Sequence, residues 1–443
     1  MLSALRRNAE KIVFAFGAAL MVFGYGLAVG KLRLFPHDII EAAAEAGRDW
    51  EENWRHYLGV RSRWLQPTGR QSRLPVHEPA RVWAGDTFVT QYRDGAFGAD
   101  LLAMDGTVLH HWKLLLPEIW RAAGYTAPPM ADEDATTHGA ELLPNGDVVA
   151  SIGGYVVARI DACSRVVWAK RIAAHHTLHV LPDGEILAPG TIRHTRPNPA
   201  WPRLRLGPSG YFDDQTVLRI SLEDGRVLEE FSIIDTLYKS GWEGLLFAGR
   251  GSSYAMAEND PLHMNDVEML RPEIAAAFPM FKAGDLLVSL RNLQTLVVLD
   301  GETRQVKWSM TGPFYGQHDP DFTPDGRIVV FDNRISGTPP QLGPSRVLAI
   351  DPATHRVTWS FQGSPEEPFY TPVAGKVQHL PNGNILALSP QDGTIIELAR
   401  DGAGRSEIVW EYVNLVAPGT VGMLFDMTRV PKVEAPWVGA ACS

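Results

Sequence analysis

One turn, Pro-Asx-Gly, recurs at four separated positions, and this repeat constrains the fold more than any other feature of the chain. The turns occupy residues 143–146, 181–184, 323–326 and 380–383. Each turn is followed by a short apolar run, as expected of a strand that leaves a tight turn. A tryptophan recurs later in most units, at Trp112, Trp168, Trp308, Trp359 and Trp410. Repetition of this kind predicts stacked structural units rather than independent domains.

Each unit is interpreted as four short antiparallel strands, with Phe231 in the place of the tryptophan in the third unit. The units cover residues 79–115, 138–172, 174–233, 261–312, 316–363 and 372–414. Four-stranded units that recur every 40–50 residues or so are typical of β-propeller blades. We therefore predict an all-β fold, a six-bladed β-propeller over residues 79–430, with a C-terminal tail at 431–443. The first unit lacks an innermost strand, and we expect Val421 to Val430 to supply it and close the ring.

The N-terminus contains a run of nineteen uncharged residues, Ile12 to Gly30, which is long enough to cross a bilayer as one helix. Arg6, Arg7 and Lys11 precede this run. The positive-inside rule then predicts a cytoplasmic tail at 1–11, an inner-membrane anchor at 12–30, and a propeller on the periplasmic or extracytoplasmic side. A cleaved signal peptide is the alternative, because Ala28-Val29-Gly30 suits a cleavage site. The anchor is favoured because the run is longer than a usual signal core.

Residues 31–78 are predicted to form a helical linker between the membrane segment and the propeller. Asp38 and Glu41 suit the start of a helix, and Ile40, Trp50 and Trp54 fall on one face at helical spacing. We expect a short amphipathic helix that ends near residue 59 and packs against the propeller. Contact of its apolar face with the membrane surface or with a partner helix is the alternative.

The composition excludes some classes of function. The net charge is −10 and no basic cluster occurs, so no nucleic-acid partner is expected. The two cysteines, Cys163 and Cys442, have no metal-ligand spacing, and their pairing stays open. A long insertion at 193–215, which carries Trp201 and Tyr211, is either a cover for the channel mouth or a variable surface excursion.

Histidines occupy one repeated position in the predicted inner strands. Six residues before the turn prolines stand His138, His176, His318 and Gly375, and His263 fits the same pattern in the fourth unit. Four blades are thus expected to direct an imidazole toward the central channel. Structural hydrogen bonding within each blade is the alternative. A metal site is not predicted, because these histidines are far apart in sequence and have no carboxylates at ligand spacing.

Arg291 follows the strand 285–290, at the channel end of the blade that carries His263. A guanidinium group among imidazoles predicts a pocket for a tetrahedral oxyanion. The alternative is a surface arginine at the end of a strand.

Four sequence elements over residues 260–320 carry a family resemblance. In order they are His263-Met-Asn265, the Ser-x-Arg strand that ends at Arg291, Val306-Lys-Trp308 and Gln317-His318. In these elements the chain resembles the bacterial arylsulfate sulfotransferases. The resemblance implies a six-bladed propeller that moves a sulfuryl group from an aryl sulfate donor to a phenolic acceptor. It also implies that the reaction uses no nucleotide sulfate donor, no metal and no other cofactor.

The resemblance assigns roles residue by residue. His318 corresponds to the histidine that is transiently sulfated, while His263 and Arg291 hold the sulfuryl oxygens and assist the leaving phenolate. His176 completes the catalytic set, and the remaining candidates for substrate binding are Asn265, His138 and Gln317. These residue types suit the chemistry, because neutral imidazole is a good nucleophile and fixed donors stabilise charge on the sulfuryl oxygens.

Two other functions are weighed against this one. A non-catalytic propeller, anchored at the membrane, would present its channel or rim to a ligand or partner protein. A hydrolase on the same scaffold would use water in place of the phenol. Transfer measured with and without added phenol separates the hydrolase from the transferase.

Overall fold

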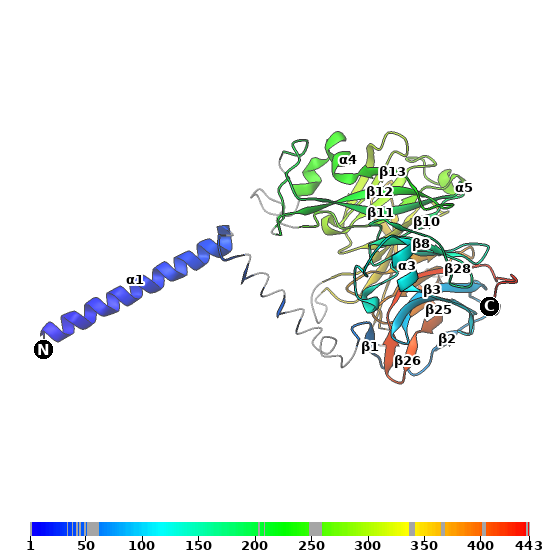
Figure 1. Cartoon of the computed structure of the whole chain (residues 1–443), viewed down its shortest axis with the longest axis horizontal. Helices are drawn as coiled ribbons and strands as arrows, with labels where there is room; N and C mark the ends of the chain where they lie inside the picture. The colour runs from blue at the N-terminus through cyan, green and yellow to red at the C-terminus, as the bar shows by residue number, and fades with distance from the viewer. Residues whose placement is uncertain are drawn as a thin grey trace. The chain divides into compact units, whose positions relative to one another are not determined.

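The computed structural model describes residues 2–32, part of 34–50, and 62–442 apart from 203, 208, 248–258, 336–341, 365–367, 401–404 and 440–441. The chain separates into two compact units, residues 1–63 and 64–443. The described part of the first unit is helical, and the second unit is built mainly from strands (Figure 1).

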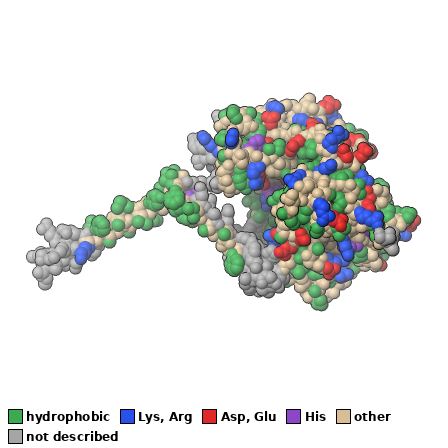
Figure 2. Space-filling model, viewed as in Figure 1, with side chains coloured by type: hydrophobic (Ala, Val, Ile, Leu, Met, Phe, Trp, Pro, Cys, Tyr) green, Lys and Arg blue, Asp and Glu red, His purple; other side chains and the backbone are tan. Residues whose placement is uncertain are grey.

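The first unit contains one long helix, α1 (Leu2–Leu32). Its segment Val13–Leu32 is long and apolar enough to cross a membrane, by length and composition. Large side chains such as Phe14 and Met21 are exposed, and hydrophobic side chains line the helix in Figure 2. A bilayer would cover these side chains, and a signal sequence has the same composition. The predicted amphipathic helix between residues 38 and 59 falls largely outside the described residues.

The second unit contains six antiparallel sheets of four or five strands, counted over its described residues. The first has β28 (Leu424–Val430), β3 (Asp86–Arg93), β4 (Ala96–Leu102) and β5 (Val108–Lys113). The second has β6 (Ala140–Leu142), β7 (Val148–Ile152), β8 (Val156–Ile160) and β9 (Val166–Arg171). The third has β10 (His179–Val180), β11 (Glu185–His194), β12 (Phe212–Ser221) and β13 (Val227–Ser232).

The remaining three large sheets follow in chain order. The fourth has β14 (Met264–Met269), β15 (Leu286–Leu290), β16 (Thr295–Leu299) and β17 (Val306–Thr311). The fifth has β18 (His318–Phe322), β19 (Ile328–Asp332), β20 (Arg346–Asp351) and β21 (Arg356–Gln362). The sixth has β22 (Lys376–His379), β23 (Ile385–Ser389), β24 (Thr394–Arg400) and β25 (Ser406–Val413), with β2 (Val76–His77) at its outer edge.

Shorter elements connect or cover these sheets. They are a small sheet of β1 (Leu65–Pro67), β27 (Thr420–Gly422) and β26 (Leu415–Ala417), the helices α3 (Leu116–Ala122), α4 (Ile233–Lys239) and α5 (Pro272–Ala275), and the 3₁₀ turns η1 (Asp132–Asp134), η2 (Glu243–Phe247) and η3 (Arg291–Leu293). The predicted all-β class is confirmed. Because β2 pairs with β25, strands that precede residue 79 also join the sheets.

The Pro-Asx-Gly turns join the first two strands of their sheets, as expected. Gly146 and Gly383 in these turns have φ angles of 87° and 86°, a region that glycine adopts without steric cost. The strands that follow are apolar on both sides, because each sheet packs between two neighbours. Val148 belongs to the hydrophobic cluster with the first sheet, and Val149 belongs to the cluster with the third.

The C-terminal strand β28 pairs with β3 and so supplies the inner strand of the first sheet (Figure 1). This pairing confirms the expectation that a C-terminal stretch completes the first unit. A hydrophobic cluster also joins the sixth sheet to the first, with Leu386 and Trp410 packed against Val89 and Leu102. The structure also shows that the two cysteines pair. Cys163 and Cys442 form a disulfide with their Cα atoms 5.4 Å apart.

A second link between sheets runs through the inner strands. A side chain from each inner strand contacts the inner strand of the adjacent sheet, and the series returns from the sixth sheet to the first. The six contacts are Asp426 with the Ala140 N–H, Glu141 with the Val180 N–H, His179 with Asp266, Glu268 with the Phe322 N–H, Asp319 with the Val377 N–H and Gln378 with the Arg429 N–H. Buried polar groups on the inner strands are satisfied in this way.

The insertion at 193–215 is partly built into the third sheet. Strands β11 and β12 extend to His194 and from Phe212, which leaves residues 195–211 as the loop. Trp201 is buried, with its ring centroid 5.3 Å from that of His194 and 6.0 Å from that of Phe212. Trp201 therefore belongs to the core of this sheet rather than to an exposed cover.

Candidate functional site

Four histidines gather where the inner strands of four consecutive sheets begin. His138, His176 and His263 precede β6, β10 and β14, and His318 is the first residue of β18. The ring centroid of His176 lies 5.5 Å from that of His138, 5.1 Å from that of His263 and 6.1 Å from that of His318. The structure therefore brings together all four histidines predicted from the repeat.

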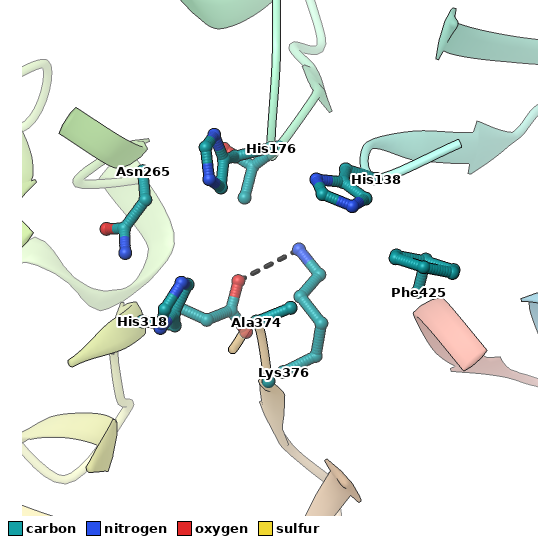
Figure 3. A pocket seen from close by; sticks show the side chains of 10 residues that line it. His138, His176, Asn265, His318, Ala374, Lys376 and Phe425 are labelled. Atoms are coloured by element: carbon teal, nitrogen blue, oxygen red, sulfur yellow. Dashed lines mark hydrogen bonds and ion pairs between the residues drawn. The ribbon is translucent and has the colours of Figure 1, made fainter. Parts of the chain in front are cut away.

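Three of these histidines, His138, His176 and His318, line a pocket together with their neighbours (Figure 3), and His263 lies beside it. Its lining residues are His138, His176, Thr177, Asn265, His318, Asp319, Ala374, Gly375, Lys376 and Phe425. Phe425 forms an aromatic wall, because its ring stacks on His138 at 4.6 Å between centroids. The lining thus combines imidazoles, the paired cation and carboxylate of Lys376 and Asp319, and one aromatic face.

Irregularities in the inner strands direct several side chains into this cavity. The register shifts between Met264 and Asp266 in β14, and between Leu424 and Asp426 in β28. The residues within these shifts, Asn265 and Phe425, both line the cavity. A bulge adds one residue to a strand and re-aims its side chain, which explains how regular strands present these groups.

His318 has a defined tautomer. Its Nδ1 lies 2.7 Å from Oδ1 of Asn333 and 3.0 Å from the carbonyl oxygen of Gly316. The amide nitrogen of Asn333 donates to the carbonyl oxygens of Thr371 and Ala374, so the amide oxygen faces the imidazole. Nδ1 therefore carries the hydrogen, and the lone pair lies on Nε2.

His318 is also held neutral. Burial and the nearby charge of Arg291 lower the pKa of His318 to about 3. Two other imidazoles follow the same pattern, since burial and neighbouring histidines lower the pKa values of His138 and His175 to about 4. His138, His175 and His318 are therefore neutral at neutral pH.

Arg291 begins η3 beside the histidines. Its backbone N–H donates to the carbonyl oxygen of His263 at 3.2 Å, and its Nη1 donates to Oδ1 of Asn292 at 3.2 Å. Its buried Nε has no hydrogen-bond partner among the described residues. Burial lowers the pKa of Arg291, yet a guanidinium group stays charged at any working pH. An oxyanion would satisfy its free donor.

Asn265 and Gln317 differ in what they offer to a substrate. The amide nitrogen of Asn265 donates to the carbonyl oxygen of Gln317 at 2.7 Å, and its buried Oδ1 is unpartnered within the described part of the chain. The Gln317 side chain donates instead to Oγ of Ser289 and to the carbonyl oxygen of Thr295. Gln317, like His263 and Arg291, is not among the residues that line this cavity.

Lys376 was not predicted from the sequence. Its Nζ lies 2.8 Å from Oδ1 of Asp319 and 3.5 Å from Oδ1 of Asp426, and the first of these contacts is drawn in Figure 3. Counting back from the turn proline ends on Gly375, one residue short of this lysine. Lys376 is the fifth residue before the turn proline, the place that Asp319 holds in the preceding sheet, so the count of six did not include this buried cation.

A second cavity shares Asp319 and Lys376 with the first. Its lining is rich in carboxylates, which include Glu141, Glu268 and Asp321. Burial raises the pKa of Glu268 to about 8. The same lining also contains His179, Arg271 and Lys376. Over the described residues, no group of three or more His, Cys, Asp or Glu is arranged to hold a metal ion.

Comparisons with known proteins connect the site to a family. The family model described as arylsulfotransferase (ASST) matches residues 139–414, which is more than half of the chain. The match includes His176, His263, Arg291 and His318, and it begins one residue after His138. No curated protein matches the chain.

Solved structures that resemble the chain have low sequence identity to it. A protein of unknown function from Bacteroides caccae is 13% identical and covers 78% of this chain and 99% of its own, with a TM-score of 0.46. The β-propeller domain of Cps50 (Swd1) from Myceliophteria thermophila is 10% identical and covers 78% and 90%, with a TM-score of 0.41. The WD40 β-propeller domain of Doa1 is 11% identical and covers 82% and 96%, with a TM-score of 0.39.

Proposed function

The chain belongs to the arylsulfotransferase family, and from that premise we propose that it transfers a sulfuryl group from an aryl sulfate to a phenolic acceptor through a sulfohistidine at His318. The proposed donor is the aryl ester itself, without a nucleotide sulfate donor. The observation that carries the proposal is the buried, neutral His318, whose Nδ1 donates to Asn333 and whose Nε2 makes no hydrogen bond within the described part of the chain.

The first half-reaction forms one bond and breaks another. Nε2 of His318 attacks the sulfur of the aryl sulfate, an N–S bond forms, and the S–O bond to the aryl group breaks. The phenolate leaves with the electron pair and takes a proton from a neighbouring imidazolium, for which His263 is the candidate. A covalent intermediate of this kind divides one difficult transfer into two easier steps.

The second half-reaction returns the enzyme to its starting state. The oxygen of the acceptor phenol attacks the sulfur of sulfohistidine, the N–S bond breaks, and Nε2 regains its lone pair. The phenol proton passes to the imidazole that gave its proton in the first step. Atoms and charge balance over the cycle, since one proton moves from the acceptor to the departing phenolate.

Arg291 supports both half-reactions in this proposal. Charge accumulates on the sulfuryl oxygens in each transition state, and a fixed cationic donor in a site that excludes water contributes most there. The unpartnered Nε of Arg291 and the unpartnered Oδ1 of Asn265 are suited to an oxyanion and a phenolic hydroxyl, respectively. His176, in contact with the other three imidazole rings, and His138, stacked on Phe425, complete the wall.

The architecture proposed for this activity is a closed six-bladed propeller over residues 79–430, with the histidines at one end of the channel. It is supported by the pairing of β28 with β3, by the cluster between the sixth and first sheets, and by the inner-strand contacts. We further propose that residues 12–30 anchor the chain in the inner membrane and that the propeller lies on the extracytoplasmic side. Arg6, Arg7 and Lys11 support this orientation.

The decisive experiment is an intact-mass measurement on the purified protein after brief exposure to p-nitrophenyl sulfate, with no acceptor and no nucleotide. The proposal predicts the gain of one sulfuryl group and the release of nitrophenol. The adduct should disappear when phenol is added and should not form in His318→Ala. His379→Ala is the matched control, because His379 lies on an inner strand but lines the second, carboxylate-rich cavity instead.

Each other outcome has a defined meaning. Folded protein that forms no adduct and releases no nitrophenol contradicts the transferase and favours a binding function. Hydrolysis is favoured if nitrophenol release does not depend on added phenol and no phenyl sulfate forms. An adduct that persists in His318→Ala assigns the nucleophile to another histidine.

A further inference from the structure

Asp260 contacts His263 twice. Its Oδ2 lies 2.6 Å from Nδ1 of His263, and its Oδ1 accepts the backbone N–H of the same residue at 2.8 Å. His263 has a φ angle of 45°, which is uncommon for a residue with a side chain. The carboxylate therefore holds both the backbone and the ring of His263 in one orientation.

Two other elements hold Asp260 in turn. Gln215 on β12 donates from Nε2 to Oδ1 of Asp260 at 3.1 Å. Asn292 donates from Nδ2 to the backbone carbonyl oxygen of Asp260 at 2.8 Å, and its Oδ1 accepts from Nη1 of Arg291. Asp260 is thus part of a network that links His263 to Arg291, and a carboxylate fixed in this way loses little entropy when it orients an imidazole.

Burial and the contacts with His263 together determine the charge of Asp260. Burial opposes ionisation, but the hydrogen bonds and charge of His263 lower the pKa of Asp260. An ionised carboxylate at Nδ1 stabilises the protonated form of the ring and leaves Nε2–H as the available donor. The ring of His263 lies beside that of His176, which lines the cavity, so the ring that carries this donor adjoins the site.

We infer that Asp260 is a positioning residue that holds His263 as the general acid for the departing phenolate, which extends the donor range to aryl sulfates with poor leaving groups. The inference rests on the proposed transfer reaction and adds to it a residue and a class of substrate. In the first half-reaction, the S–O bond breaks and the proton of Nε2–H passes to the phenolate oxygen. In the second, the neutral ring accepts the proton of the attacking phenol, and Asp260 stabilises the imidazolium again.

The dependence on the leaving group tests this role. A nitrophenolate is stable enough to leave without a proton, whereas an unsubstituted phenolate needs one. Asp260→Asn keeps the shape of the side chain and removes its charge. We expect Asp260→Asn to lower kcat/KM for phenyl sulfate by about 100-fold or more, and for p-nitrophenyl sulfate by less than about fivefold, since general acid catalysis contributes about 10²–10⁴-fold. His263→Ala should show the same selectivity, and the double variant should add little to either single variant.

Matched variants keep the result interpretable. Asp213→Asn is the control, because Asp213 pairs with Arg193 on the same hairpin as Gln215 and contacts none of the histidines among the described interactions. Asp260→Glu keeps the charge and should recover part of the activity on phenyl sulfate. Thermal unfolding of each variant shows whether the fold is retained.

The outcomes separate the inference from the proposed function. Wild-type protein that transfers no sulfuryl group contradicts the proposed function. Active wild-type protein whose Asp260→Asn variant loses the same factor on both donors contradicts the role of Asp260 while leaving the transfer reaction standing. The role of Asp260 is also contradicted if Asp260→Glu loses as much activity on phenyl sulfate as Asp260→Asn does. Charge at this position would then be irrelevant.

Discussion

The imidazole of His318 donates its Nδ1 hydrogen to Oδ1 of Asn333 across 2.7 Å, and Asn333, which directly follows β19, is fully buried. Asn333 cannot rotate its amide without losing two donor contacts, to the carbonyl oxygens of Thr371 and Ala374. A partner that sets the tautomer of a reactive histidine influences its reactivity without touching the substrate.

Asn333→Ala should therefore slow the sulfation of His318. We expect the rate of adduct formation from p-nitrophenyl sulfate to fall by about 10- to 100-fold, as is usual when the partner that orients a reactive imidazole is lost. Asn414→Ala is the control, because Asn414 is also a fully buried asparagine that bonds to backbone carbonyl groups, those of Tyr92 and Gly422, and it faces no histidine of the site. Equal losses in both variants would mean that the effect is structural.

Arg291→Lys should be nearly as inactive as Arg291→Ala. Lysine keeps the charge but has no planar fork, and the free donor at Nε of Arg291 has no counterpart in it. We expect kcat/KM for p-nitrophenyl sulfate to fall by about 10²–10³-fold in both variants. Arg271→Lys in the second, carboxylate-rich cavity is the control. Full activity of Arg291→Lys would show that charge alone is needed.

Sulfation of His318 should persist in mildly acidic solution. Burial and the charge of Arg291 lower the pKa of His318 to about 3, so its Nε2 stays unprotonated at pH values where an exposed histidine is charged. We expect adduct formation from p-nitrophenyl sulfate to fall by less than about threefold between about pH 7 and about pH 5. Rapid-quench mass spectrometry measures it, and a tenfold loss centred near the ordinary histidine pKa would contradict the prediction.

Glu268 should make the protein less stable as the pH rises. Burial raises its pKa from 4.5 to about 8, so the folded state favours the protonated form. The stabilisation from this group is present below its ordinary pKa and is lost as the pH rises through about 8. Glu268→Gln should therefore raise Tm relative to wild type more at about pH 9 than at about pH 5. Glu273→Gln, at an exposed glutamate of α5, should show no such trend.

Removal of the disulfide should lower stability and leave catalysis intact. Cys163 and Cys442 are separated by 279 residues, so the bond restricts a very long loop in the unfolded chain. We expect Cys163→Ser to lower the free energy of unfolding by about 2–5 kcal/mol in chemical denaturation. Neither cysteine lines the histidine cavity, so kcat should not change. Wild-type protein kept reduced should match the variant, and an unchanged midpoint would refute the prediction.

Some of the site could be predicted because it depends on local patterns. The Pro-Asx-Gly turns and the alternation of side chains along a strand are properties of a few adjacent residues, so they identified the repeated strands and the register of His138, His176 and His318. The same alternation explains why the Gln317 side chain does not line the cavity. Neighbouring residues in a strand point to opposite sides, and since His318 faces the cavity, Gln317 faces Ser289 in the preceding sheet.

Other parts of the site depend on contacts that no local pattern records. Lys376 and Phe425 reach the cavity from strands far along the chain, and Asn333 reaches His318 from the end of the neighbouring strand β19. Two of the inner strands also aim residues into the cavity through shifts of register. Local propensities do not encode such shifts.

The sequence by itself therefore determined the repeated strands, the ring of histidines and the family, because these follow from turn chemistry, strand periodicity and motif order. Only the tertiary structure decided which imidazole has a free Nε2, that Asp260 orients His263, that Lys376 is the buried cation, and that Cys163 pairs with Cys442. Each of these depends on atoms brought within hydrogen-bonding or covalent distance by the packing of separate sheets, which is a property of the whole fold.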